Sequence, residues 1–128
     1  MSALYLGTGN LEKYLVERLN KKLTQNPDIR MTLLTDYMRG TRLSKAGEST
    51  YTLLRPLKTE TFNSKVRVGF FHMPDTGTLK GRFSESPFRE IFGVHHIKAH
   101  VFDDNVLITG ANLSEDYFTD RQDRCMVI

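Results

Sequence analysis

Strand-like and helix-like segments alternate along the first 71 residues, and this alternation restricts the folds open to the chain. Short apolar runs with the length and composition of strands lie at 3–6, 29–36 and 66–71. After the first run, Leu11, Leu15, Leu19 and Leu23 fall at helical spacing and predict a helix with those leucines in the core. Asn10 is its candidate N-cap, and Pro27 follows its end. The order strand, helix, strand predicts α/β units on a partly parallel sheet.

The rest of the chain predicts loops, one short helix and a β-hairpin. Loops are expected at 41–50 and 73–87, and a short helix limited by Pro56 at 51–57. Strands are expected at 95–102, 106–109 and 125–128, the first two joined by Asp103-Asp104-Asn105. No turn follows the last strand. We therefore expect one domain, 1–128, that is truncated at its C-terminus and belongs to a longer protein.

Composition and charge limit the kinds of partner and of metal or disulfide site that the chain can have. The chain has 128 residues, a single cysteine (Cys125) and no apolar run long enough to span a bilayer. One cysteine excludes an internal disulfide and a multi-cysteine zinc site, and we expect no secretory leader. Residues 1–102 carry 16 basic and 9 acidic side chains, whereas 103–128 carry 2 and 6. A basic body favours an anionic partner such as phosphate, nucleotide, anionic lipid or nucleic acid.

The chemically informative pattern is H-x-K-x4-D-x6-G-x-N, formed by His96, Lys98, Asp103, Gly110 and Asn112. Residues two apart in a strand share a face, so His96 and Lys98 are expected side by side. The hairpin would bring Gly110 and Asn112 back towards them, and Gly110 would let the backbone approach the substrate phosphate closely. An imidazole can attack phosphorus, an ammonium and an amide can hold phosphoryl oxygens, and a carboxylate can orient a histidine. Phosphodiester chemistry needs these groups, and no metal site is expected.

This spacing resembles the signature of the phospholipase D superfamily. The runs LYLGTGNLE, TDYMRGTR, VRVGFFHMP and HIKAHVFDDNVLITGANLSEDYFTDRQDR resemble one branch of it, the mitochondrial phosphatidylglycerophosphate synthases of eukaryotes. The resemblance implies a mixed sheet flanked by helices that forms one half of a two-motif pseudo-dimer. It also implies a mitochondrial location, and transfer of a phosphatidyl group from CDP-diacylglycerol to glycerol 3-phosphate, with phosphatidylglycerophosphate and CMP as products.

By the same resemblance, His96 would be the nucleophile, with the histidine of a second motif in that role as the open alternative. Lys98 and Asn112 would hold the phosphoryl oxygens. Asp103 would orient a histidine. Superfamily sites use two such motifs and this chain has one, so the second histidine would come from a missing half-domain. We therefore expect the segment alone to be inactive.

Two further arginine pairs are candidate ligands of substrate phosphate. Arg39 and Arg42 flank a glycine just after a strand end, where α/β sheets bind ligands. Surface exposure in a basic turn is the competing interpretation. Arg121 and Arg124 are the second pair, and surface ion pairs with their acidic neighbours are the alternative for them.

The turn after the first strand resembles a phosphate-binding loop, but a lone G-x-G without G-K-[ST] is a weak signal. A plain turn is the preferred interpretation. The alternative is a nucleotide site, for ATP or the CDP moiety of the donor. Its candidate residues are Gly7, Thr8, Gly9, Asn10, Leu11, Glu12, Lys13 and Tyr14.

Two other function classes compete with a phosphatidyltransferase. One is a phosphodiesterase or nuclease that completes its site by homodimerising, which suits the basic body. The other is an inactive binding module. For the favoured interpretation the partners are CDP-diacylglycerol, glycerol 3-phosphate, a membrane surface and the missing half-domain, and nucleic acid is not expected.

Overall fold

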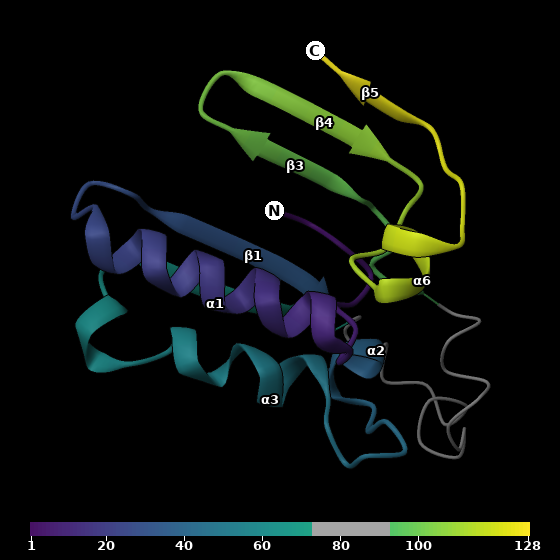
Figure 1. The fold of residues 1–128 in the computed structure, drawn as a ribbon, viewed down its shortest axis with the longest axis horizontal. Coiled ribbons are helices and arrows are strands. Elements are labelled where there is room, and N and C mark those ends of the chain that lie inside the picture. The colour runs from purple at the N-terminus through teal and green to yellow at the C-terminus, as the bar shows by residue number, and fades with distance from the viewer. Residues whose placement is uncertain (73–92) are drawn as a thin grey trace, which may run out of the picture.

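The structure, a computed structural model, describes residues 1–72 and 93–128 (Figure 1). The loop predicted at 73–87 lies outside the described residues. Two groups of strands form the sheet. β1 (Met31–Asp36) and β2 (Val66–Phe71) pair in parallel. β3 (Ala99–Phe102), β4 (Asn105–Thr109) and β5 (Cys125–Val127) form an antiparallel group in that order.

The N-terminal segment joins the two groups of strands. Ser2 bridges Leu34 of β1 in parallel and Ala99 of β3 in antiparallel orientation. Ser2 and Ala99 exchange backbone hydrogen bonds of 2.8 and 3.1 Å. The predicted strand at 3–6 is thus an extended segment held by isolated bridges, and the sheet is mixed, as predicted.

The helices lie beside the sheet: α1 (Asn10–Gln25), α2 (Tyr37–Thr41), α3 (Thr50–Leu54) and α6 (Glu115–Thr119). Two 3-10 turns, Arg55–Leu57 and Glu60–Phe62, lead into β2. The Asn10 cap prediction is wrong, because Gly9 is the N-cap of α1 and no side chain caps that end. Figure 1 shows α1 and α3 covering the β1–β2 part of the sheet. None of the helices in these described ranges is both long and apolar enough to cross a membrane.

The core lies between α1, α3 and β1–β2. Its buried members are Leu6, Val16, Leu23, Met31, Leu33, Leu54, Leu57, Phe62 and Val66. The leucine stripe expected for α1 is only partly correct: Leu23 is buried, Leu15 and Leu19 are partly buried, and Leu11 is 37% exposed. The buried line instead runs through Glu12, Val16 and Leu23, so a carboxylate occupies the first turn of the core-facing side.

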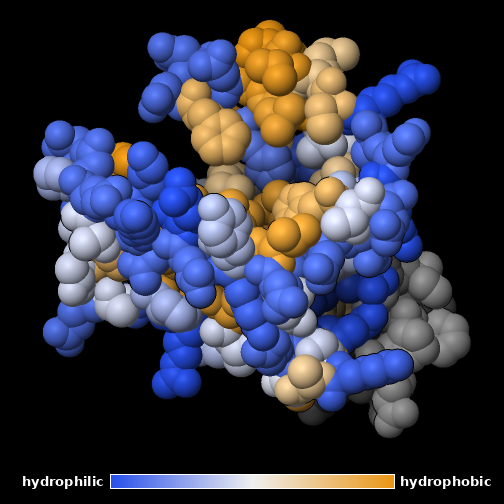
Figure 2. All heavy atoms as spheres, viewed as in Figure 1, coloured by the Kyte–Doolittle hydropathy of each residue, from blue (hydrophilic) through white to orange (hydrophobic). Residues whose placement is uncertain are grey.

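The antiparallel group leaves apolar side chains in solvent. Val101, Phe102, Ile108, Met126, Val127 and Ile128 are all about half exposed or more. Figure 2 shows a hydrophobic concentration over this part of the molecule, in contrast to the hydrophilic surface around α1. Exposed apolar patches of this kind commonly mark contact surfaces.

Residues 1–128 on their own should therefore self-associate. Sedimentation velocity over a concentration series should detect this, and Val127→Lys should reduce it because a charge would be buried in the contact. Lys21→Gln, on the exposed side of α1, is the control. A monomer throughout the concentration series would contradict the prediction. Strong phosphodiesterase activity of such a dimer would favour the homodimeric alternative.

Candidate active site

One edge of the sheet gathers the polar residues of the motif. The N-terminal segment, β1 and β4 run in one direction, and β3 and β5 run in the other. Residues at the C-terminal ends of the N-terminal segment, β1 and β4 therefore lie near residues that precede β3 and β5. This edge, where α2 and α6 lie in Figure 1, receives Asp36, His96, Lys98, Asn112 and Asp123.

His96 and Lys98 lie against each other. Lys98 Nζ lies 3.1 Å from each ring nitrogen of His96, and it donates to the His96 carbonyl oxygen at 3.1 Å. The ladder begins only at Ala99, so the strand expected from 95 is shorter at its start, and the pair lies in the extended segment before β3. His96 is exposed and Lys98 is buried. The His96 imidazole thus faces solvent and lies against the buried Lys98 ammonium.

Burial lowers the pKa of Lys98 from its ordinary value, and the negative charge of Asp123 acts in the opposite direction. Burial disfavours the charged ammonium, and a nearby carboxylate favours it. Asp123 is one of the acidic neighbours of Arg121 and Arg124, for which the sequence predicts only a surface ion pair. The structure places it beside the start of β5, at the same edge as Lys98.

The hairpin returns Gly110 and Asn112 to the start of β3, as predicted. The Thr109 backbone N–H donates to the Lys98 carbonyl at 3.1 Å. Asn112 is buried, and no donor in the described ranges reaches its side-chain oxygen. A Cβ at Gly110 would approach the Asp123 carboxylate to 2.7 Å. The missing side chain therefore makes room for that carboxylate, a reason different from the close ligand approach that was expected.

Asp103 lies at the other end of β3. It occupies the turn between β3 and β4, is exposed, and has φ 53°, a left-handed conformation that aspartate tolerates better than most residues. Five residues of extended chain separate it from Lys98, a span of about 16 Å. Within this chain the full length of β3 separates Asp103 from His96, so Asp103 shapes the hairpin turn, and its orientation of a histidine stays a prediction.

Asp36 is a site residue that sequence reasoning missed. It is buried at the end of β1, and its carboxylate accepts from the backbone N–H groups of Arg39 and His95, each at 3.0 Å. It caps α2 and also fixes the segment that carries the motif. An aspartate between an apolar strand and a short helix is the signal that identifies such a cap. His95 also lies 2.5 Å from Ser2 Oγ through Nε2, which agrees with a structural role for it.

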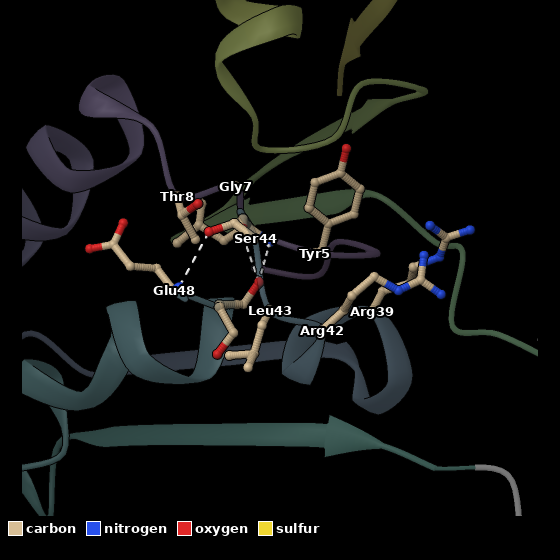
Figure 3. Close-up of a pocket in the computed structure, with 11 residues that line it drawn as sticks. Tyr5, Gly7, Thr8, Arg39, Arg42, Leu43, Ser44 and Glu48 are labelled. Atoms are coloured by element: carbon tan, nitrogen blue, oxygen red, sulfur yellow. Dashed lines mark hydrogen bonds between the residues drawn. The ribbon is translucent and has the colours of Figure 1, made fainter. Parts of the chain in front are cut away.

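Arg39 and Arg42 line a pocket of about 230 Å³ together with Gly7 and Thr8. The close-up in Figure 3 shows both arginine side chains extending in the same direction, away from Ser44 and Glu48. Two candidate sites that are distant in the sequence therefore share one pocket.

The turn at Gly7–Gly9 is built around Glu12. A Cβ at Gly7 would collide with the Glu12 carboxylate, and one at Gly9 with the carboxylates of Glu12 and Glu115. Glu12 is 1% exposed and accepts from the backbone N–H of Glu115 at 2.5 Å. The buried Glu12 carboxylate would repel a nucleotide phosphate at the start of α1. This favours the plain turn over a nucleotide loop. Leu11 and Tyr14 are exposed on α1, and Lys13 pairs with Glu48 at 2.9 Å.

Arg121 and Arg124 are exposed near α6. Arg121 Nη1 donates to the Tyr117 hydroxyl at 3.4 Å, and Nη2 lies 3.9 Å from Asp116. The surface-pair alternative thus describes Arg121, with Asp116 as its partner. Across 1–72 and 93–128, no three His, Cys, Asp or Glu residues cluster as metal ligands would.

Comparison with known proteins places this geometry in context. No protein-family model matches the chain. Its whole length is 45% identical to the mitochondrial CDP-diacylglycerol–glycerol-3-phosphate 3-phosphatidyltransferase of Gallus gallus, of which it spans 23%. It is likewise 38% identical to the probable enzyme of that name in Dictyostelium discoideum, covering 100% of this chain and 22% of the relative. The Homo sapiens mitochondrial enzyme is 40% identical over 97% of the chain and 23% of its own length.

The crystal structure of phosphatidylserine synthase from Haemophilus influenzae shares the fold. It superposes on 99% of this chain with a TM-score of 0.60, 24% sequence identity and 27% of its own length covered. The phospholipase D-like mixed α/β fold is thereby confirmed. The chain spans about a quarter of the length of the curated relatives it matches. It is a homologue of the CDP-diacylglycerol–glycerol-3-phosphate 3-phosphatidyltransferases, with a phospholipase D-like fold.

Proposed function

We propose that this segment supplies one histidine motif of an enzyme that transfers a phosphatidyl group from CDP-diacylglycerol to glycerol 3-phosphate. The observation that carries the proposal is the His96–Lys98 pair: an exposed imidazole whose ring nitrogens lie 3.1 Å from a buried ammonium. The homologues support the choice of reaction. A mitochondrial location, as in the names of several relatives, is part of the same proposal.

The reaction proceeds in two displacements. A ring nitrogen of His96 attacks the phosphorus of the phosphatidyl group, the bond to CMP breaks, and a histidine of the second half-domain protonates the departing CMP oxygen. That histidine then removes the proton of a glycerol 3-phosphate hydroxyl. The hydroxyl oxygen attacks the same phosphorus and displaces His96, giving phosphatidylglycerophosphate. Nucleophile and proton carrier thus occupy different half-domains.

Lys98 and Asn112 stabilise the charge that develops on the phosphoryl oxygens. Lys98 is buried and therefore acts in a poorly screened environment, where one positive charge stabilises an anion more strongly than in water. The buried amide of Asn112 lies on the returning arm of the hairpin. The mechanism assigns no step to a metal ion.

The test uses a two-motif enzyme, defined here as the Gallus gallus relative in which residues 1–128 replace the segment they align with. Given CDP-diacylglycerol and either glycerol 3-phosphate or L-serine, it should release CMP and form phosphatidylglycerophosphate with the first acceptor only. Phosphatidylserine as the main product, or hydrolysis with neither acceptor used, would contradict the proposal.

Asp123→Asn should shift the alkaline limb of the pH–rate profile of the two-motif enzyme to lower pH. Lys98 acts when protonated, so activity falls as pH rises through its pKa. The Asp123 charge raises that pKa against the effect of burial, so its removal lowers the pKa further.

Asp123→Glu should keep the limb near its original position, and Asp120→Asn, on the exposed end of α6, is the matched control. If the alkaline limb of Asp123→Asn stays in place or moves to higher pH, the Asp123 carboxylate does not raise the pKa of Lys98 in the active enzyme.

A further inference from the structure

We propose that the pocket between the Tyr5–Thr8 segment and the Arg39–Thr50 segment binds the phosphomonoester of the acceptor, the phosphate that glycerol 3-phosphate keeps throughout the reaction. This inference rests on the proposed function and adds a substrate subsite to it. The pocket has a volume of about 230 Å³. Pockets for drug-sized ligands are larger, roughly 300–1,000 Å³. The size suits a small polyol phosphate.

The lining of the pocket has the chemistry of an anion site. Arg39 and Arg42 both line it, and their side chains extend in the same direction (Figure 3). Guanidinium groups bind phosphate through paired N–H donors, with a geometry that lysine lacks. Glu48 is the one acidic residue among the described lining, and Lys13 neutralises it at 2.9 Å. The described lining thus has more basic than acidic side chains, as an anion site requires.

The walls of the pocket are held in place before any ligand binds. Thr50 Oγ1 accepts from the Leu6 N–H at 3.1 Å and donates to the Leu6 carbonyl at 2.5 Å, which fastens α3 to the N-terminal segment. Ser49 and Thr52 form a capping box at the start of α3. Ser44 closes the loop by backbone and side-chain bonds to Glu48. A preorganised wall lowers the entropy cost of ordering a site around a small ligand.

The position of the pocket relative to His96 suits an acceptor. Arg39 is one turn from Asp36, whose carboxylate binds the backbone of both Arg39 and His95, each at 3.0 Å. The buried Asp36 side chain therefore links α2, which carries Arg39, to His95, the neighbour of His96. The donor diphosphate is placed by His96, Lys98 and Asn112 in the proposed mechanism. A phosphate held at a neighbouring pocket leaves the acceptor hydroxyl free to reach the phosphohistidine.

The decisive variant is Arg42→Ala in the two-motif enzyme, because Arg42 is exposed and its removal opens no core cavity. We expect KM for glycerol 3-phosphate to rise about 10- to 100-fold, the usual loss for a charge-assisted hydrogen-bonded pair. KM for CDP-diacylglycerol should stay within about twofold. Turnover with free glycerol, which lacks the phosphate, should not change. Arg42→Lys should recover only part of the affinity, and Arg55→Ala, an exposed arginine outside the pocket, is the control.

Two outcomes would overturn the inference: an unchanged KM for glycerol 3-phosphate, or slower labelling of Arg42→Ala by CDP-diacylglycerol in the absence of acceptor. The second would assign the pocket to the donor. Direct binding separates this inference from the proposed function. If the unsubstituted protein forms no phosphatidylglycerophosphate, calorimetry with glycerol 3-phosphate still decides the matter. At least tenfold weaker binding to Arg42→Ala supports the pocket, and equal binding refutes it.

Discussion

His96→Ala should reduce phosphatidyl transfer by the two-motif enzyme by at least about 10⁴-fold, because loss of a covalent nucleophile removes the whole double-displacement route. Imidazole is the good nucleophile of the motif at neutral pH, whereas an amine with an ordinary pKa near 10.4 is largely protonated. The exposed ring of His96 also contributes nothing to the core, so the variant should fold. Initial rates of CMP release and of phosphatidylglycerophosphate formation measure the effect.

The matched control for His96 is His100→Gln. His100 is buried on β3, two residues beyond Lys98, and burial together with the N-terminal amino group lowers its pKa, so it remains neutral inside the sheet. It should change thermal stability without removing the reaction. If His96→Ala retains more than about a hundredth of the activity, His96 is not the nucleophile, and the histidine of the other half-domain takes that role.

Lys98→Ala should lower kcat by about 10²–10³-fold while covalent labelling at His96 persists at a reduced rate. The estimate follows the loss expected when one donor to a developing oxyanion is removed. Because Lys98 is 5% exposed, alanine also leaves a cavity, and Lys98→Met separates the two effects by filling the space without charge. Equal losses in both variants identify the charge as the cause.

EDTA should not change the rates of the unsubstituted or the Lys98-substituted enzyme, because the lysine ammonium and the asparagine amide supply the stabilisation in this mechanism. Restoration of activity in Lys98→Met would show that the charge of Lys98 is not what stabilises the transition state. Complete loss of activity on chelation would show that a metal takes part.

Several elements of the fold follow from short-range sequence patterns. Val66–Phe71 is a nearly continuous apolar run, interrupted by Arg67, and β2 has those bounds. The Asp-Asp-Asn cluster predicted the hairpin, although Asn105 belongs to β4 and the turn is shorter. α2 was not predicted, because its five residues include Gly40 and Thr41, which have low helix propensity. Its formation depends on the cap from Asp36, a contact that a periodicity argument does not contain.

The site was predictable where its residues are close in sequence, but the contacts that the sheet makes between distant segments were not. His96 and Lys98 are adjacent because they are two apart in extended chain. Asp103 is nearer in sequence to Lys98 than Asp123 is, but it lies at the far end of β3, whereas Asp123, just before β5, lies at the same edge as Lys98. The pocket shared by Gly7 and Arg42 likewise depends on how the N-terminal segment inserts beside β1. Register and strand order fix these contacts, and neither is encoded in local spacing.

Covalent labelling tests the central claim most directly. The two-motif enzyme is mixed with CDP-diacylglycerol labelled at the phosphatidyl phosphate, without acceptor, then quenched with base and digested for peptide mapping. We expect acid-labile, base-stable label on the peptide that contains His96. When glycerol 3-phosphate is added before the quench, this label should be released as phosphatidylglycerophosphate. Label that persists in His96→Ala, or that maps only to the other half-domain, would contradict it.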